Sequence, residues 1–149
     1  MDKEFKVTRK QIIQAAESML GLPFVHQGRC DETGVDCVGL LVVMGQKIQY
    51  PKIVDAEAYR RIPSAEVIRE IIELNCDEIP LEDAKEGDIY LMRLTGLKPR
   101  HAAIIYHDER RPDEPMLLHA TKKGVRIEPK SKYPESWFVR AYRVRGLVD

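Results

Sequence analysis

The stretch GVDCVGLLVVMG, residues 34–45, places an Asp-Cys pair directly before an apolar run. Its β-branched residues favour a strand, but a continuous apolar run bounded by glycines is equally typical of a buried helix, so the pattern leaves both open. If the run is a helix, Cys37 lies in its first turn, where unpaired N–H groups favour a negative charge and an oxyanion. Asp36 would then cap that turn. The stretch therefore predicts a reactive thiol, which needs a base from elsewhere in the chain.

Two of the four histidines are placed to provide that base. His101 opens one apolar strand, His119 closes another, and the segment between them, HDERRPDEP, has the polarity and prolines of a turn. In a hairpin folded symmetrically about Arg110, the two imidazoles face each other on one side of the sheet, about 5 Å apart at Cβ. One imidazole would take the thiol proton, and the other would hydrogen-bond its far nitrogen. We therefore expect Cys37, His101 and His119 to form a catalytic triad.

The composition is that of one ordinary globular domain spanning residues 1–149. Hydrophobic residues make up 44% of the chain and charged residues 32%, and Lys plus Arg equals Asp plus Glu at 24 each. This balance gives no global field that would recruit nucleic acid or a membrane surface. The charged N-terminus, MDKEFKVTRK, has no signal-peptide core, and no apolar run reaches the roughly 18–20 residues that span a bilayer. We therefore expect synthesis in the cytoplasm without a signal peptide.

The periodicity predicts helices first and a sheet afterwards, which is an α+β order. Thr8 and Gln11 match a capping box ahead of a helix that ends at Gly21, and residues 23–34 are expected to form a loop. A second helix is capped by Ser64, with its apolar residues inward (Val67, Ile68, Ile71, Ile72 and Leu74). Five strands of a mostly antiparallel sheet follow, at IYLMR, HAAIIY, MLLHAT, VRIEP and FVRAYRV.

In this order and spacing, several segments resemble the NlpC-type cell-wall peptidases, cysteine hydrolases with a pared-down papain-like fold. The matching segments are GLPFVHQG (21–28), VDCVGL (35–40), EGDIYLM (86–92), RHAAIIY (100–106) and LLHAT (117–121). The resemblance implies that residues 38–44 form a central helix whose N-terminus lies against the sheet. It also implies that Cys37 is the nucleophile, His101 the general base and acid, and His119 the orienting residue, with no cofactor or metal.

The chemistry implied by the resemblance is hydrolysis of peptidoglycan peptide stems through a thioester, often at the bond between γ-D-glutamate and a diamino acid. Two positions depart from the family pattern. Phe24 stands where the family has Tyr, and Val38 where it has Ser after the nucleophile. Both family positions commonly help to hold the amine end of the substrate, so we expect Phe24, Val38 and the neighbouring Asp36 to contact substrate. The resemblance therefore does not determine which amide bond of the substrate this chain prefers.

The small size and the ending WFVRAYRV also resemble the phage-associated branch of this family, whose members ride with a tail or a gene-transfer particle. By this analogy the particle delivers the enzyme to the cell wall, and tail proteins are its partners.

Three other functions are compatible with parts of the sequence. A non-catalytic tail component would share the fold, and a related amidase or acyltransferase would use the same triad on another amide. A zinc-binding module would draw on His26, Cys30 and Cys37, but their spacings match no common zinc finger or ribbon. For the remaining cysteines we expect core packing or an unpaired loop thiol at Cys30, with oxidation to a Cys30–Cys37 pair as a further hypothesis, and simple burial at Cys76.

Overall fold

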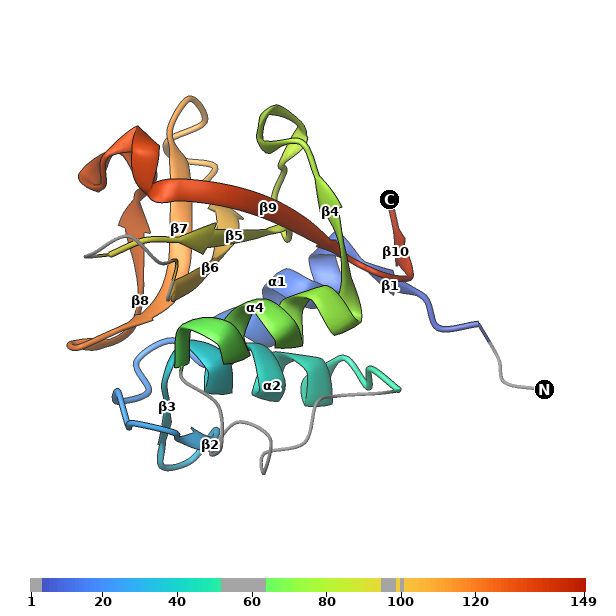
Figure 1. Ribbon diagram of the computed structural model, residues 1–149, viewed down its shortest axis with the longest axis vertical. Helices are drawn as coiled ribbons and strands as arrows, with labels where there is room; N and C mark the ends of the chain where they lie inside the picture. The colour runs from blue at the N-terminus through green and yellow to red at the C-terminus, as the bar shows by residue number, and fades with distance from the viewer. Residues whose placement is uncertain (1–3, 52–63, 95–98, 100) are drawn as a thin grey trace.

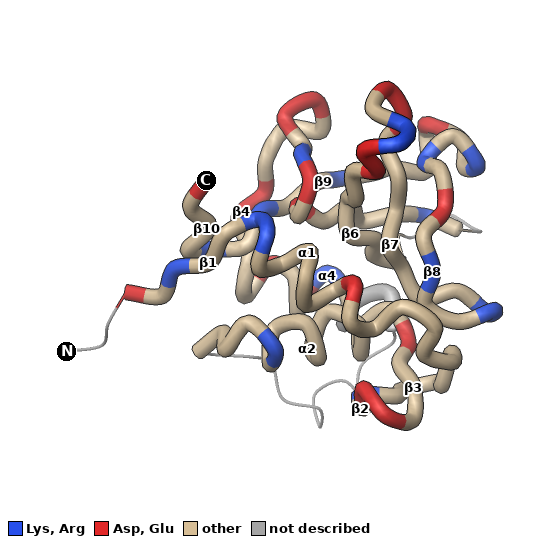
Figure 2. Tube along the Cα trace, turned by 180° about the vertical axis from the view of Figure 1, so that it is seen from behind, with Lys and Arg blue, Asp and Glu red and all other residues tan. Residues whose placement is uncertain are grey.

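The computed structural model describes residues 4–51, 64–94, 99 and 101–149, and in the helix that begins at Ser64 it describes side chains from Ile68 onward. Among the described residues, three α-helices lie against one side of a curved six-stranded sheet (Figure 1). The expected α+β class and the mostly antiparallel sheet are confirmed. None of the described helices is long and apolar enough to cross a membrane. Acidic and basic residues are interspersed along the loops of the sheet (Figure 2).

The first helix begins at the predicted capping box. Helix α1 spans Arg9–Glu17, with Thr8 as its N-cap. The Thr8 hydroxyl accepts a hydrogen bond from the Gln11 amide at 3.1 Å, and the Thr8 amide donates to the Gln11 side chain at 2.8 Å. These bonds satisfy backbone donors that a helix start leaves unpaired. Just before α1, strand β1 (Val7–Thr8) pairs in parallel with the C-terminal strand β10 (Leu147–Val148).

The ambiguous apolar run is a helix, α2, spanning Cys37–Lys47. It is apolar on all sides, as is typical of a central helix. Helix α2 packs against α1, against the helix α4 (Ser64–Asn75) and against the sheet. Its residues Val38 to Gly45 are all buried.

Helix α4 turns most of the predicted apolar residues inward. Ile68, Ile71 and Ile72 are buried, whereas Leu74 is 55% exposed, so the prediction for Leu74 is wrong. The reason is geometric: two residues beyond Ile72 is about 200° around a helix of 3.6 residues per turn, which carries Leu74 to the outer face. The Val67 side chain lies outside the described residues.

All five predicted strands are present in the main sheet, and the sixth strand of that sheet was missed. The sheet order is β4-β9-β5-β6-β7-β8, with every neighbouring pair antiparallel. Its strands are β4 (Cys76–Ile79), β5 (Ile89–Met92), β6 (His101–His107), β7 (Pro115–Thr121), β8 (Gly124–Pro129) and β9 (Phe138–Val144). The missed strand is β4, an edge strand whose short sequence CDEI carries two adjacent acids and gives no alternating apolar pattern.

The two faces of the sheet belong to different apolar clusters. Ala102, Ile104 and Leu118 join the core beneath the helices. Ala103, Ile105 and Leu117, which alternate with them, join a second cluster on the other face with Tyr90 and Phe138. Three short 3-10 helices lie outside the strands: η1 (Leu81–Asp83), η2 (Lys130–Lys132) and η3 (Glu135–Trp137).

The segment before α2 is more ordered than the predicted loop. Strands β2 (Arg29–Cys30) and β3 (Gly34–Val35) form a small antiparallel ribbon, and Phe24 makes a further bridge to Val35. Because two-residue strands are too short to show an alternating pattern, polar and glycine-rich composition concealed them. This ribbon carries the chain directly into the Asp-Cys pair.

Candidate active site

Cys37 is the first residue of α2, and Asp36 is its N-cap. One Asp36 carboxylate oxygen accepts a hydrogen bond from the Gly39 amide at 2.7 Å, and the other accepts from the Gln27 amide at 2.9 Å. The predicted capping role of Asp36 is therefore confirmed. The cap also ties the loop before β2 to the first turn of the helix, which fixes the position of the thiol between them.

Close contact between Gly28 and Gly39 also fixes the position of the first turn of α2. A side chain at Gly39 would collide with the Gly28 carbonyl oxygen, so backbone packs directly on backbone at this point. The Gly34 backbone has φ 137°, a conformation that favours glycine. The glycines in this part of the sequence thus allow the β2–β3 ribbon to pack against the nucleophile helix.

The two predicted histidines meet across β6 and β7. His101 Nε2 lies 2.7 Å from His119 Nδ1, and the ring centroids are 4.9 Å apart. Both side chains are buried. The predicted strand register was wrong by two residues. Ile104 pairs with Leu118, so the hairpin is centred on Arg111 rather than Arg110. Because this changes the pairing by two residues, both histidines still lie on the same face of the sheet.

Cys37, His101 and His119 line one cavity of about 520 Å³. Phe24, which is 39% exposed, and the buried Val38 line it too. The predicted substrate-binding residues are therefore placed in the same cavity as the triad, and their contact with substrate stays a prediction. The other lining residues are His26, Asp36, Leu94, Ala120, Thr121, Lys122, Tyr133 and Trp137.

The surroundings of the thiol favour its neutral form. Although Cys37 is partly open to the cavity, burial of its sulfur and the nearby Asp36 carboxylate raise its pKa to about 12. Hydrogen bonds from the backbone amides of Ala102, Val38 and Cys37 act in the opposite direction and are outweighed. Burial and Asp36 therefore outweigh the effect of the helix start on the thiol pKa, and forming a thiolate here would require a proton acceptor.

Both imidazoles are also held neutral. Burial and the neighbouring His119 lower the pKa of His101 to about 3, against a smaller effect of Glu128. Burial likewise lowers the pKa of His119, although Glu128 opposes this. A neutral imidazole keeps a ring nitrogen lone pair, so the histidines of this cavity retain a nitrogen that could accept a proton at physiological pH.

The sequence analysis missed Glu128, which lies directly behind His119. Its Oε1 is 2.7 Å from His119 Nε2, and only 7% of the residue is exposed. The short turn of Lys122 and Lys123 between β7 and β8 could have predicted this contact. This turn pairs Leu117 with Glu128, and so places the acid diagonal to His119 on the same face.

Tyr133 and Trp137 form a missed aromatic wall of the cavity. The Tyr133 ring packs edge-on to His119, with centroids 5.8 Å apart, and Trp137 lies beyond it at 6.1 Å. Tyr133 follows η2 and Trp137 is the last residue of η3. Neither short 3-10 helix has a periodicity that predicts an inward side chain. The wall makes this side of the cavity apolar, which suits catalysis in a site with little water.

The residues of the alternative zinc site are not gathered together. Within residues 4–51, 64–94, 99 and 101–149, no group of three or more His, Cys, Asp or Glu side chains is arranged to hold a metal ion. Cys30 is an exposed free thiol, as one of the two expectations for it stated, and Cys76 is buried as predicted. The oxidised Cys30–Cys37 pair stays a hypothesis.

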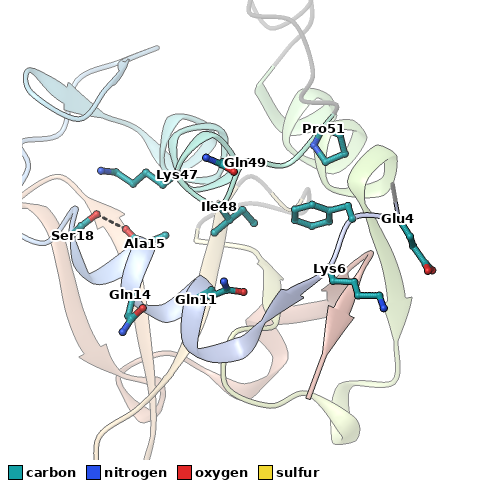
Figure 3. Close-up of a pocket in the computed structure, with 11 residues that line it drawn as sticks. Glu4, Lys6, Gln11, Gln14, Ala15, Ser18, Lys47, Ile48, Gln49 and Pro51 are labelled. Atoms are coloured by element: carbon teal, nitrogen blue, oxygen red, sulfur yellow. Dashed lines mark hydrogen bonds between the residues drawn. The ribbon is translucent and has the colours of Figure 1, made fainter. Parts of the chain in front are cut away.

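A larger groove of about 800 Å³ lies elsewhere, between the N-terminal segment and the end of α2 (Figure 3). Gln11, Gln14, Ser18, Lys47 and Gln49 give it a polar lining, and its lining includes no thiol or imidazole. The 11-residue length of α2 separates it from Cys37 by about 15 Å. The smaller cavity, which is lined by the thiol and the imidazoles, is therefore the candidate active site.

Comparison with solved structures finds the same architecture in NlpC/p60 proteins. A Staphylococcus aureus protein, described as similar to a lipoprotein of the NLP/p60 family, superposes with a TM-score of 0.62 and 21% identity. The match covers 91% of this chain and 41% of that one, so this chain spans less than half of its length. The NlpC/p60 domain of the peptidoglycan hydrolase SagA superposes with a TM-score of 0.60 and 19% identity, covering 93% of this chain and 98% of that one.

The chain has the NlpC/p60 fold. RipD from Mycobacterium tuberculosis, described as a non-catalytic NlpC/p60 domain protein adapted to peptidoglycan binding, matches it as well, with a TM-score of 0.60, 14% identity and coverage of 92% and 95% of the two chains. Comparisons of the sequence with family models and with curated proteins found no match. Since the NlpC/p60 fold occurs in a hydrolase and in a non-catalytic protein, the fold does not decide the activity.

Proposed function

We propose that this chain is a cysteine hydrolase that cleaves amide bonds in the peptide stems of peptidoglycan. One observation carries the proposal: the nucleophile candidate at the start of α2 shares a cavity with the hydrogen-bonded pair of His101 and His119. Peptidoglycan as the substrate is supported by the NlpC/p60 neighbours, one described as a peptidoglycan hydrolase and another as adapted to peptidoglycan binding.

The first half of the reaction acylates the thiol. His101 accepts the proton of Cys37 as the sulfur attacks the amide carbonyl, so no free thiolate accumulates beforehand. The carbonyl oxygen gains negative charge, which backbone N–H groups in the first turn of α2 stabilise. As the C–N bond breaks, His101 returns its proton to the leaving amine, and a thioester between the substrate acyl group and Cys37 remains.

The second half restores the enzyme. Water gives a proton to His101 while its oxygen attacks the thioester carbonyl. The C–S bond then breaks, a carboxylic acid leaves, and Cys37 regains its proton. In both halves His119 holds the His101 ring through the 2.7 Å hydrogen bond and does not itself contact the reacting atoms.

The proposed bond is that between γ-D-glutamate and a diamino acid, following the NlpC-type resemblance. Phe24 and Val38 place a ring and a methyl-bearing side chain in the cavity where the family pattern has hydroxyls. These residues would bind the amine side of the substrate through apolar contact, while Asp36 shapes the site as the helix cap.

The proposal includes delivery by a phage-like particle, on the basis of the resemblance of the segment WFVRAYRV to tail-associated members. Detection of the chain by mass spectrometry in purified particles would support this part, and its absence from them would contradict it.

The test of the activity is incubation with peptidoglycan sacculi. Purified wild-type protein and the variant Cys37→Ser are each incubated with sacculi, and released fragments are identified by mass spectrometry. We expect fragments with the wild type alone, and their new ends name the bond cleaved. If both proteins bind sacculi and release nothing, the chain is a non-catalytic binding protein.

A further inference from the structure

The buried Glu128 is the centre of a polar cluster behind the two imidazoles. Besides its contact with His119, its Oε1 accepts a hydrogen bond from the Tyr133 hydroxyl at 2.7 Å. Its Oε2 accepts one from the Lys132 ammonium. Glu128 is the penultimate residue of strand β8, while Lys132 and Tyr133 follow in and after η2, so one short segment supplies the whole cluster.

The cluster keeps Glu128 ionised. Burial alone would raise the pKa of Glu128, but the hydrogen bonds from Lys132, Tyr133 and His119 outweigh it and lower the pKa to about 2. An ionised carboxylate only accepts hydrogen bonds. The 2.7 Å contact to His119 therefore requires the proton to sit on His119 Nε2.

The proton on His119 Nε2 determines the protonation of His101. A neutral imidazole carries one ring proton, so His119 Nδ1 has a lone pair and acts as an acceptor. His101 Nε2 lies 2.7 Å from that nitrogen and must donate to it. The single proton of neutral His101 is then on Nε2, and its Nδ1 has none. The nitrogen left over is the one that can accept a proton.

We propose that Glu128 is a positioning residue that fixes the tautomers of His119 and His101, so that His101 acts as a base through its unprotonated Nδ1. The proposal deepens the proposed function, since it concerns how the same site obtains its base. It gives Lys132 a defined part, because the ammonium fixes which oxygen of the acid faces which donor.

The variant Glu128→Gln tests this by replacing one carboxylate oxygen with an NH₂ group. Lys132 donates and cannot accept, so it selects the amide orientation in which the oxygen of Gln faces Lys132. The NH₂ group then faces His119 and donates to Nε2, which reverses every hydrogen bond in the series. His101 is left with its proton on Nδ1 and cannot take the thiol proton.

Two further variants separate this effect from simple damage. In Glu128→Gln combined with Lys132→Met, the amide is free to turn its oxygen toward His119, which restores the original tautomers in part. Glu135→Gln makes the same chemical change at an 83%-exposed acid paired with Lys130, outside the cluster. It should leave the tautomers unchanged.

The first readout is a long-range ¹H–¹⁵N NMR spectrum of the imidazoles, which distinguishes protonated from unprotonated ring nitrogens. For the wild type we expect protons on Nε2 of both His101 and His119, and for Glu128→Gln protons on Nδ1 of both. A wild-type spectrum with the proton on His101 Nδ1 overturns the proposal, and it does so even if the single variant fails to fold. Unchanged tautomers in folded Glu128→Gln overturn it too.

The second readout is the rate of Cys37 alkylation by iodoacetamide at pH 7. Glu128→Gln should slow it about tenfold or more, since the thiol loses its base. The double variant should recover part of the rate, and Glu135→Gln should match the wild type. Equal rates in all four proteins contradict the proposal.

Neither readout uses peptidoglycan, so the two proposals fail separately. Reversed tautomers together with an absence of fragments from sacculi would remove the hydrolase function and keep the role of Glu128. Unchanged tautomers together with Cys37-dependent release of fragments would do the opposite.

Discussion

His101 Nε2 lies 2.7 Å from His119 Nδ1, although the strand register places the two residues diagonally rather than opposite each other. Diagonal neighbours across a strand pair are farther apart than direct partners, but long or aromatic side chains still reach each other. The pair is buried, and burial lowers the pKa of both imidazoles and raises that of the Cys37 thiol in the same cavity, which favours the neutral form of all three groups.

This charge state predicts a loss of stability in mild acid. Burial and the neighbouring His119 lower the pKa of His101 to about 3 from 6.5, so between these values the unfolded chain binds more protons than the folded one. The stabilisation is fully present above pH 6.5 and is lost as the pH falls, by about 2 kcal/mol from His101 alone between pH 6.5 and 5. Glu128, with a lowered pKa of about 2, adds to the loss below pH 4.5.

Urea denaturation at pH 7 and pH 5 measures this effect. The variant His101→Gln lacks the titrating group, so the free energy of unfolding should fall less between the two pH values than in the wild type. An equal fall in both proteins would show that His101 is not held neutral by the fold.

The reactivity of Cys37 should depend on His101. Because the pKa of the Cys37 thiol is raised to about 12 by burial and Asp36, alkylation at pH 7 requires a base. His101→Ala should slow alkylation of Cys37 about tenfold or more. Peptide-resolved mass spectrometry follows each cysteine separately, and the exposed Cys30 serves as an internal control whose rate should not change. An unchanged rate at Cys37 would favour a structural role for this thiol.

Gly39→Ala should disrupt the start of α2. The added methyl group would collide with the Gly28 carbonyl oxygen, and backbone on both sides leaves little room to move. We expect a loss of about 2–3 kcal/mol in the free energy of unfolding, the usual size of an overpacking effect. Gln46→Ala, at an exposed position of the same helix, is the control and should stay within about 0.5 kcal/mol. Equal stability of the two variants would contradict the close packing.

Asp88 links the start of helix α1 to strand β9 through two arginines and should be needed for stability. Its fully buried carboxylate accepts hydrogen bonds from Arg9 at 3.1 Å and from Arg143 at 3.1 and 2.9 Å. Asp88→Asn removes the buried charge that both guanidinium groups contact, leaving Arg9 with its exposed partner Asp149, which should cost about 3 kcal/mol. The matched variant Asp77→Asn breaks only the exposed pair with Arg145 and should cost less than about 1 kcal/mol. Thermal and urea unfolding measure both losses of stability. Equal losses in the two variants would contradict the proposed importance of Asp88.

The sequence was informative where local chemistry determines the structure. The capping box of Thr8 and Gln11, the Asp36 cap and the five strands follow from short-range patterns, and they are present. The NlpC-type resemblance resolved the helix of residues 38–44, which periodicity left open. The sequence predicted that Cys37, His101 and His119 lie in one site, because each stands at or near the end of a recognisable element.

The remainder of the site depends on pairings that the sequence does not state locally. Glu128 reaches His119 only because of the β7–β8 register, and Tyr133 enters the cavity from a 3-10 turn. Burial and the Asp36 carboxylate raise the pKa of Cys37 despite its place at a helix start, and this burial cannot be deduced from the local sequence. These features arise from tertiary packing.

The most direct test of covalent catalysis is competition between water and hydroxylamine for the acyl group. Sacculi are incubated with the wild type or Cys37→Ser in increasing hydroxylamine, and fragment ends are identified by mass spectrometry. A thioester on Cys37 predicts that hydroxamate ends replace carboxylate ends as hydroxylamine rises, with the wild type only. Carboxylate ends alone at every concentration, or the same hydroxamates with Cys37→Ser, would contradict a Cys37 thioester.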